Sequence, residues 1–232
     1  MKRKLILLPG MDGTGELFAD FIEALTDSFE TKSVRYPTDV CLSYAELMTF
    51  VRSVTDASKP FVLIAESFST PLAIQYAATN PPNLKGLVLC AGFASSPARG
   101  WLRYLGLFFS PFIFRVVLPR LAAKFLLVGP NASHALLAVV KAAISSVKPN
   151  VLSARLCTIL DCDARTELTQ VAVPILYLQA NQDRLVPVSC FDEIRRIKPQ
   201  TLVTKISGPH LLFQREPQQT AEVVTRFIQQ LE

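Results

Sequence analysis

Two patterns of apolar residues alternate along this chain. One consists of continuous apolar stretches of strand length, and in the other apolar residues recur every three to four positions. The first pattern predicts strands over residues 4–8, 31–36, 61–65, 84–91, 173–180 and 201–206. The second predicts helices over residues 16–28, 43–57, 71–79, 188–197 and 217–231. Such alternation is typical of βαβ units, so we expect an α/β core of about six mostly parallel strands flanked by helices.

The alternation is interrupted between residues 94 and 165. This stretch contains only helical segments, which are separated by Pro97, Pro111, Pro119, Pro130 and Pro149. Because 232 residues suit one α/β domain with an insertion better than two domains, we expect a core formed by residues 1–93 and 166–232. Residues 94–165 are predicted to form a helical cap on that core.

The composition excludes several classes of protein. With 50% hydrophobic and 19% charged residues, the chain is expected to fold rather than to stay disordered. The apolar run LGLFFSPFIFRVVLP is broken by Ser110, Pro111 and Arg115 before it reaches the roughly 18 to 20 residues of a membrane helix, so no transmembrane segment is expected. The net charge of +5 accompanies no aromatic-rich basic motif, which argues against nucleic-acid binding.

The five cysteines indicate in which cellular compartment the protein is expected. They form no CxxC pair and no spacing with histidine that suits a metal site, and their number is odd. Scattered cysteines of this kind are expected to be reduced thiols, which predicts a cytoplasmic protein without a metal centre.

A candidate nucleophile lies where a predicted strand meets a helix. In FVLIAESFSTPLA, Ser67 stands at the sharp turn, with Ala65 and Ser69 two residues before and after it. A nucleophile on such a turn has a strained backbone, so its neighbours two positions away must be small, as in the pattern G-x-S-x-G. The sequence therefore predicts Ser67 as a nucleophile, and helix capping is the alternative role for a serine at this position.

A serine nucleophile needs a base, and the chain has two histidines. His210 follows the last predicted strand, in ISGPHLLF, and catalytic groups gather in loops after the carboxyl ends of strands in open α/β sheets. His134 lies instead in the helical insertion, on an apolar background. We therefore expect His210 to be the base and His134 to have a structural or cap-lining role.

An acid is required to orient the imidazole and to stabilise its charged form. Asp183 lies in LQANQDRLVP, just after the strand predicted over residues 173–180 and at the same edge of the sheet as the serine and the histidine. Asp161 and Asp163, at the end of the insertion, are weaker candidates, and closing an Asx turn is the alternative role for Asp183. We predict Asp183 as the acid.

Together these segments resemble the α/β-hydrolase superfamily over nearly the whole chain. The order Ser, Asp, His is the family's order, LLPGMDGTGELF resembles its oxyanion loop, and GPHLLFQREP resembles its histidine loop. The resemblance implies an oxyanion hole formed by the backbone N–H groups of Phe68 and Met11. Pro9 stands where many relatives carry histidine, so the hydrogen bond with which that histidine would brace the loop is expected to be missing, which weakens the assignment of Met11. Asp12 is expected to brace the turn, and Glu66 to have a structural hydrogen-bonding role.

The glycine-rich segment GMDGTG follows a strand and precedes a helix, as phosphate-binding loops do. Its spacing is not G-x-G-x-x-G, and no Walker lysine follows it. No cysteine occupies a strand-to-helix turn either. The residues thus argue against nucleotide binding and cysteine chemistry, and no cofactor is predicted.

The insertion indicates the class of substrate. WLRYLGLFFSPFIFRVV is dense in aromatic and branched residues without a clean single-face helical period. Because a small cap cannot bury all of them, we expect Trp101, Tyr104, Phe108 and Phe112 to line a pocket for an apolar acyl group.

The insertion is also strongly basic. It has two acidic residues, Asp161 and Asp163, and nine basic ones: Arg99, Arg103, Arg115, Arg120, Lys124, Lys141, Lys148, Arg155 and Arg165. Such a surface suits an acidic acyl carrier protein, a carboxylate-bearing substrate or an anionic lipid surface, and a merely solvated face is the alternative.

These observations predict a cofactor-independent serine carboxylic-ester hydrolase. We expect it to act on short to medium acyl esters through an acyl-enzyme, with Ser67, His210 and Asp183 as its triad. The compact core and helical cap are also similar to the esterases that demethylate pimeloyl-carrier-protein esters, which is the leading alternative. Acyl transfer to an alcohol and non-hydrolytic binding of a small apolar ligand are the remaining alternatives.

Overall fold

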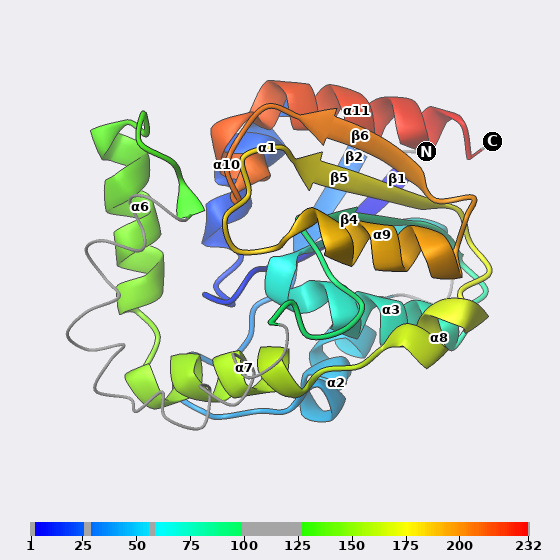
Figure 1. The fold of residues 1–232 in the computed structure, drawn as a ribbon, viewed down its shortest axis with the longest axis horizontal. Helices are drawn as coiled ribbons and strands as arrows, with labels where there is room; N and C mark the ends of the chain where they lie inside the picture. Colours follow the sequence, from blue (N-terminus) through cyan, green and yellow to red (C-terminus); the bar gives the residue numbers. More distant parts are fainter. Residues whose placement is uncertain (1–2, 26–28, 56–58, 99–126, 232) are drawn as a thin grey trace.

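The computed structural model describes residues 3–25, 29–55, 59–98 and 127–231 (Figure 1). Its six strands form one sheet in the order β2-β1-β3-β4-β5-β6, and every neighbouring pair is parallel. The strands are β1 (Arg3–Leu8), β2 (Phe29–Ser33), β3 (Phe61–Glu66), β4 (Leu84–Cys90), β5 (Ile175–Ala180) and β6 (Leu202–Ile206). The predicted six-stranded α/β core is confirmed.

Burial along the strands follows their place in the sheet. The inner strands β3 and β5 are buried at every residue, which explains their continuous apolar sequences. The edge strand β2 instead alternates between partly buried and exposed residues. Side chains of successive residues point to opposite faces, so Ile6 and Leu8 join one apolar cluster while Leu5 and Leu7 join another.

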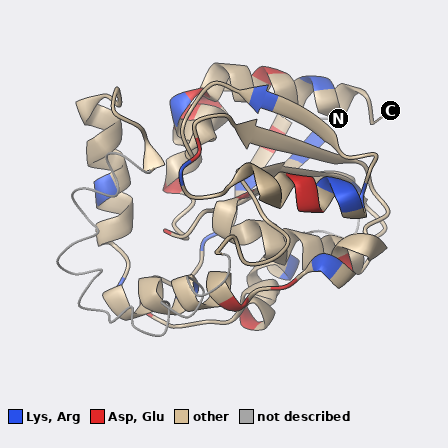
Figure 2. Cartoon of the chain, in the orientation of Figure 1, with Lys and Arg blue, Asp and Glu red and all other residues tan. Residues whose placement is uncertain are grey.

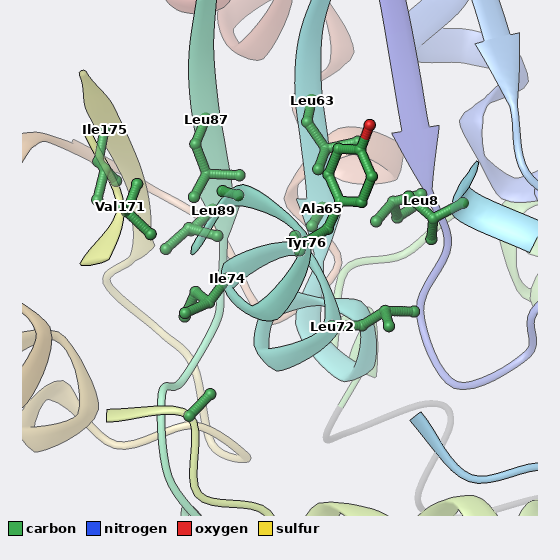
Figure 3. Close-up of a cluster of buried hydrophobic side chains, with 14 of the residues drawn as sticks. Leu8, Leu63, Ala65, Leu72, Ile74, Tyr76, Leu87, Leu89, Val171 and Ile175 are labelled. Atoms are coloured by element: carbon green, nitrogen blue, oxygen red, sulfur yellow. The ribbon is translucent and has the colours of Figure 1, made fainter. Parts of the chain in front are cut away.

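Helices cover both faces of the sheet (Figure 1). One cluster is formed with α1 (Ala19–Ala24), α10 (Leu212–Arg215) and α11 (Pro217–Gln229). The other is formed with α2 (Tyr44–Val54), α3 (Thr70–Ala78), α8 (Arg165–Gln170) and α9 (Val188–Ile197). Figure 3 shows part of this second cluster, to which α3 contributes Leu72, Ile74 and Tyr76 and the sheet contributes Leu63 and Leu87.

The largest differences from the predicted boundaries concern two elements. The strand predicted over residues 31–36 lies at Phe29–Ser33, because the chain leaves the sheet after Ser33 and the N–H of Tyr36 bonds to the carbonyl of Gly13. The apolar residues that suggested a longer strand pack against the glycine-rich loop instead. The helix predicted over residues 16–28 is a 3-10 turn, η1 (Glu16–Phe18), followed by α1, and it ends before Leu25, whose backbone is extended.

Two further helices belong to the predicted insertion. They are α6 (His134–Ser145) and α7 (Pro149–Asp161), and α6 stands beyond the carboxyl ends of β5 and β6 in Figure 1. The two ends of the insertion meet in an antiparallel bridge between Ser95 and Asp163, and the N–H of Ala164 donates to the carbonyl of Ala94 at 2.7 Å. The two segments that bound the predicted insertion therefore lie side by side.

Within the described ranges, no single helix has the length and apolar character needed to cross a membrane. Only α6 and α7 taken together reach that length and composition, and they meet at an angle of 93°. All five cysteines lie in the described part of the chain, and none of them forms a disulfide. The cytoplasmic location stays a prediction.

Candidate active site

The turn after β3 holds the predicted nucleophile. Ser67 has a φ of 44°, in the left-handed region that costs an L-residue about 1 to 2 kcal/mol. The chain then enters η2 (Ser67–Ser69) and α3. The segment that follows β4 passes close by, since a Cβ on Gly92 would lie 2.4 Å from Cγ2 of Thr70. Helix capping by Ser67 is excluded, because Ser69 is the N-cap residue of α3 and Ser67 directs its hydroxyl to a histidine.

A continuous chain of hydrogen bonds links the three residues predicted as a triad. Oγ of Ser67 lies 2.8 Å from Nε2 of His210, and Nδ1 of His210 lies 2.8 Å from Oδ2 of Asp183. An ionised carboxylate can only accept hydrogen bonds, so Nδ1 of His210 carries the proton and donates a hydrogen bond to Asp183. Nε2 is then unprotonated and can accept the hydroxyl proton of Ser67. The side chains of His210 and Asp183 are only 3% and 6% exposed, which keeps water from competing for these bonds.

The loop after β5 fixes Asp183 through its second oxygen. Oδ1 accepts the N–H groups of Leu185 and Val186 at 2.8 and 2.9 Å. Backbone bonds join this loop to the histidine loop, including one of 3.0 Å from the N–H of Gln182 to the carbonyl of Gly208. The acid and the base are therefore held by two loops that support each other.

The other candidates lie elsewhere. Asp163 bonds to the guanidinium of Arg165 at the base of the insertion, and Asp161 is exposed at the end of α7. His134 is exposed at the first residue of α6. Within the described residues, no hydrogen bond or ion pair joins any of these three side chains to Ser67, His210 or Asp183.

The predicted oxyanion loop runs from Gly10 to Gly15 after β1. Oδ2 of Asp12 accepts both the N–H and the hydroxyl of Thr14, at 2.8 and 2.6 Å, so the expected side-chain brace of this turn is confirmed. The N–H of Gly13 bonds to the carbonyl of Gly10 at 3.1 Å, and Gly13 and Gly15 both have positive φ. The loop is thus a tight turn that begins where β1 ends.

A hydrogen bond from another residue braces the loop beside Pro9. The hydroxyl of Ser69 donates to the carbonyl of Pro9, and it lies 2.8 Å from the hydroxyl of Tyr36. Tyr44 donates to the carbonyl of Phe68 at 2.6 Å. Burial raises the pKa of both tyrosines well above the ordinary value, so both phenols stay protonated and can donate. A serine in place of the family's glycine at position 69 therefore supplies the missing brace.

Glu66 lies beneath the turn and is 1% exposed. Burial, with a further contribution from the Asp12 charge, raises the pKa of this carboxyl to about 7. Its Oε2 lies 3.4 Å from the side-chain nitrogen of Gln214, and it accepts the backbone N–H of Gly10. Among the described residues, neither Oε1 of Glu66 nor Oε1 of Gln214 has a hydrogen-bond partner. This carboxyl thus connects the oxyanion loop with the segment that follows the histidine.

Arg155 is a residue of the site that sequence analysis counted only as part of a basic surface. It lies in the middle of α7, is 2% exposed, and donates to the carbonyls of Met11, Asp12 and Pro37. In a helix, residues four positions apart lie on the same face, so the spacing from the apolar Val151 was the one sequence signal that Arg155 could be buried.

Several predicted residues cannot be located. The expected pocket residues Trp101, Tyr104, Phe108 and Phe112 lie outside the described residues, as do the basic residues between 99 and 124. In the part of the chain that the structure describes, no group of three or more His, Cys, Asp or Glu side chains is arranged to hold a metal ion.

Comparison with known proteins identifies the family. A family model described as "Serine aminopeptidase, S33" matches residues 33–206, which is most of the chain. The chain belongs to this family. It is also 26% identical over 250 residues to the pimeloyl-[acyl-carrier protein] methyl ester esterase of Methylococcus capsulatus, with 97% of this chain and 94% of that protein covered.

Solved structures show the same fold. A hydrolase from Oleispira antarctica has a TM-score of 0.82 at 14% identity, with 99% of this chain and 92% of that chain covered. A bromoperoxidase from Bacillus anthracis has a TM-score of 0.83 at 13% identity and the same coverage. The protein is thus a serine hydrolase with the α/β-hydrolase fold and esterase-type activity.

Proposed function

We propose that this protein hydrolyses carboxylic esters with Ser67 as nucleophile, His210 as general base and acid, and Asp183 as the orienting acid. The observation that carries the proposal is the hydrogen-bond chain from Ser67 Oγ through the imidazole to Asp183, with 2.8 Å at each step. Nucleophile, base and orienting group within hydrogen-bond reach of one another are the arrangement that acyl transfer requires.

The reaction starts when Oγ of Ser67 attacks the ester carbonyl carbon and its proton passes to Nε2 of His210. The tetrahedral intermediate collapses when the C–O bond to the alcohol breaks, and His210 returns the proton to the leaving alkoxide oxygen. The acyl-enzyme then reacts with water, from which His210 takes a proton. Release of the acid returns that proton to Ser67. Asp183 remains ionised throughout and stabilises the imidazolium.

The negative oxygen of the intermediate is proposed to be held by the backbone N–H groups of Met11 and Phe68. Phe68 directly follows the nucleophile, and Met11 lies in the turn after β1, the neighbour of β3 in the sheet. Donors fixed by the fold before the reaction need no reorganisation when charge develops, and loss of one such donor costs about 10² to 10³ in kcat.

The division into a core and a cap is also a proposal. The bridge between Ser95 and Asp163 supports this division, because it brings the two ends of residues 94–165 together where that segment joins the rest of the chain. Helices α6 and α7 would then belong to the cap, and residues 1–93 and 166–232 to the core.

The substrate is proposed to be an ester with a short to medium, apolar acyl group. A carrier-bound methyl ester is the more specific candidate, because the relative from Methylococcus capsulatus is named for that substrate. The charge of the insertion favours an acidic carrier protein. Lys141 and Lys148 are exposed, and the first acidic residue after position 127 is Asp161 (Figure 2).

Kinetics on two substrates distinguish these candidates. Turnover of p-nitrophenyl esters of increasing chain length is measured beside hydrolysis of methyl pimeloyl-carrier protein. If a carrier is recognised, kcat/KM for the carrier-bound ester falls as salt rises, whereas kcat/KM for the neutral ester changes little. Replacement of Lys141 and Lys148 by Glu should reproduce the effect of salt. Equal salt dependence for both substrates would leave a general small-ester hydrolase.

Acyl transfer to an alcohol, in place of hydrolysis, has its own test. With an added alcohol, the ratio of new ester to free acid among the products is measured. An acyltransferase would give a ratio far above the ratio of the alcohol concentration to the water concentration. In either reaction that forms an acyl-enzyme, Ser67→Ala should lower kcat by about 10³ to 10⁶.

A further inference from the structure

Arg155 is a buried cation at the junction of α7 and the core. The residue is 2% exposed, and Val151 and Leu152 of the same helix are buried beside it. Among the described residues, no carboxylate lies within 4.0 Å of its guanidinium. Burying a charge is costly unless strong hydrogen bonds replace water, so an apolar residue would have served better if the position only required packing.

The guanidinium replaces water with backbone carbonyls. Nη1 donates to the carbonyls of Met11 and Asp12, and Nη2 donates to that of Pro37, at 2.8 Å in all three cases. The planar fork of arginine suits several acceptors at fixed angles, which the ammonium of lysine does not. One side chain of α7 therefore fixes two successive peptide groups of the oxyanion loop and the segment after β2.

The same guanidinium also contacts the second half of the proposed oxyanion hole. Its central carbon lies 5.9 Å from the ring centre of Phe68 and 5.8 Å from that of Tyr36. The guanidinium also packs directly against the backbone of the loop, because a Cβ on Gly13 would lie only 2.5 Å from Nη1 of Arg155. Arg155 thus touches both residues whose N–H groups are proposed to hold the oxyanion, through the carbonyl of Met11 and the ring of Phe68.

We propose that Arg155 is a positioning residue for ester hydrolysis, which fixes the oxyanion loop so that the N–H of Met11 points to the developing negative oxygen. The inference rests on the proposed function and adds a residue outside the triad to it. Arg155 contacts neither the nucleophile nor the base, so it acts on the reaction through Met11 and Phe68. Its effect belongs to the transition state, in which the carbonyl oxygen becomes charged, and not to binding of the neutral ester.

Two substitutions of Arg155 and one control test this role. Arg155→Met keeps the length of the side chain and removes all three donors, and we expect kcat to fall about 10- to 100-fold with KM within about twofold. Arg155→Lys keeps the charge without the fork, and its kcat should lie between those of the wild type and the Met variant. The control is Arg165→Met, because Arg165 is half exposed and pairs with Asp163, and it should leave kcat unchanged.

The decisive readout is the affinity for n-butylboronic acid, which forms a tetrahedral adduct with the nucleophile and has an oxygen in the position of the oxyanion. This affinity should fall by the same factor as kcat/KM in each Arg155 variant. All variants are compared well below their melting temperatures. The Lys variant carries the test if the Met variant does not fold.

Three results would overturn the inference. An Arg155 variant with a lowered melting temperature but unchanged kcat would make this residue purely structural. A raised KM with unchanged kcat would assign it to substrate binding. A fall in kcat without a parallel loss of boronic acid affinity would exclude action through the oxyanion hole. Failure of the proposed function itself would look different, because Ser67→Ala would then retain turnover.

Discussion

The serine at position 69 is expected to stabilise the fold and to support catalysis through one hydroxyl. Ser69 is fully buried, its Oγ donates to the carbonyl of Pro9, and the hydroxyl of Tyr36 lies 2.8 Å away. Since Ser69 gives its only proton to Pro9, Tyr36 must be the donor in the second bond. Ser69→Ala removes both bonds and leaves a buried phenol and a buried carbonyl without partners.

The structure allows the size of this effect to be worked out. A buried polar group left without a partner costs about 1 to 3 kcal/mol, so the two groups orphaned by Ser69→Ala should together lower the free energy of unfolding by about 2 to 6 kcal/mol. For a chain of this length the melting temperature should fall by about 2 to 4 °C for each kcal/mol. Because the Pro9 carbonyl adjoins the oxyanion loop, kcat should also fall, by about tenfold.

A double-mutant cycle isolates the hydrogen bond between the two hydroxyls. Tyr36→Phe combined with Ser69→Ala should cost about 0.5 to 1.5 kcal/mol less than the sum of the single changes, because the double variant no longer buries an orphaned phenol. Unfolding in urea measures all four proteins. The control is Ser53→Ala, which removes an exposed hydroxyl on α2 and should change stability by less than about 0.5 kcal/mol. Additive costs together with an unchanged kcat would refute the reasoning.

Two further predictions concern carboxylates. Asp183→Asn should lower kcat by about 10³ to 10⁴, less than Ser67→Ala, because the imidazole loses its orienting partner while the nucleophile remains; equal kcat for Asp183→Asn and wild type would place the acid elsewhere. The pKa of Glu66 is raised from 4.5 to about 7 by burial, so the folded protein holds a proton that the unfolded chain has released. The free energy of unfolding should therefore fall as the pH rises from 4.5 to about 7, and the urea midpoint of Glu66→Gln should not show that fall. Parallel pH profiles of the wild type and Glu66→Gln would contradict the raised pKa of Glu66.

Much of the fold and the positions of three candidate residues could be predicted because they are encoded locally. Continuous apolar runs mark the inner strands β3 and β5, which precede Ser67 and Asp183, and His210 comes shortly after the edge strand β6. In a parallel sheet, residues at the carboxyl ends of strands meet at one edge, so knowledge of the strands was enough to bring these three together.

Other features depend on contacts between distant segments. The position of β2 was misjudged because Tyr36 is buried against the glycine-rich loop and not in the sheet. The brace at Ser69 joins residues 60 positions apart, and the bonds of Arg155 to Met11 join residues 144 positions apart. No local pattern distinguishes such an arginine from one in a solvated basic face, so its role required the three-dimensional structure.

The most direct test of the account is to identify the residue that carries the acyl group. The protein is mixed with p-nitrophenyl acetate, quenched in acid during the steady state, digested and examined by mass spectrometry. The account predicts a mass increase of one acetyl group on the peptide that contains Ser67, and no such increase in a folded Ser67→Ala variant. An acetyl group on a different serine, with turnover intact in Ser67→Ala, would contradict it.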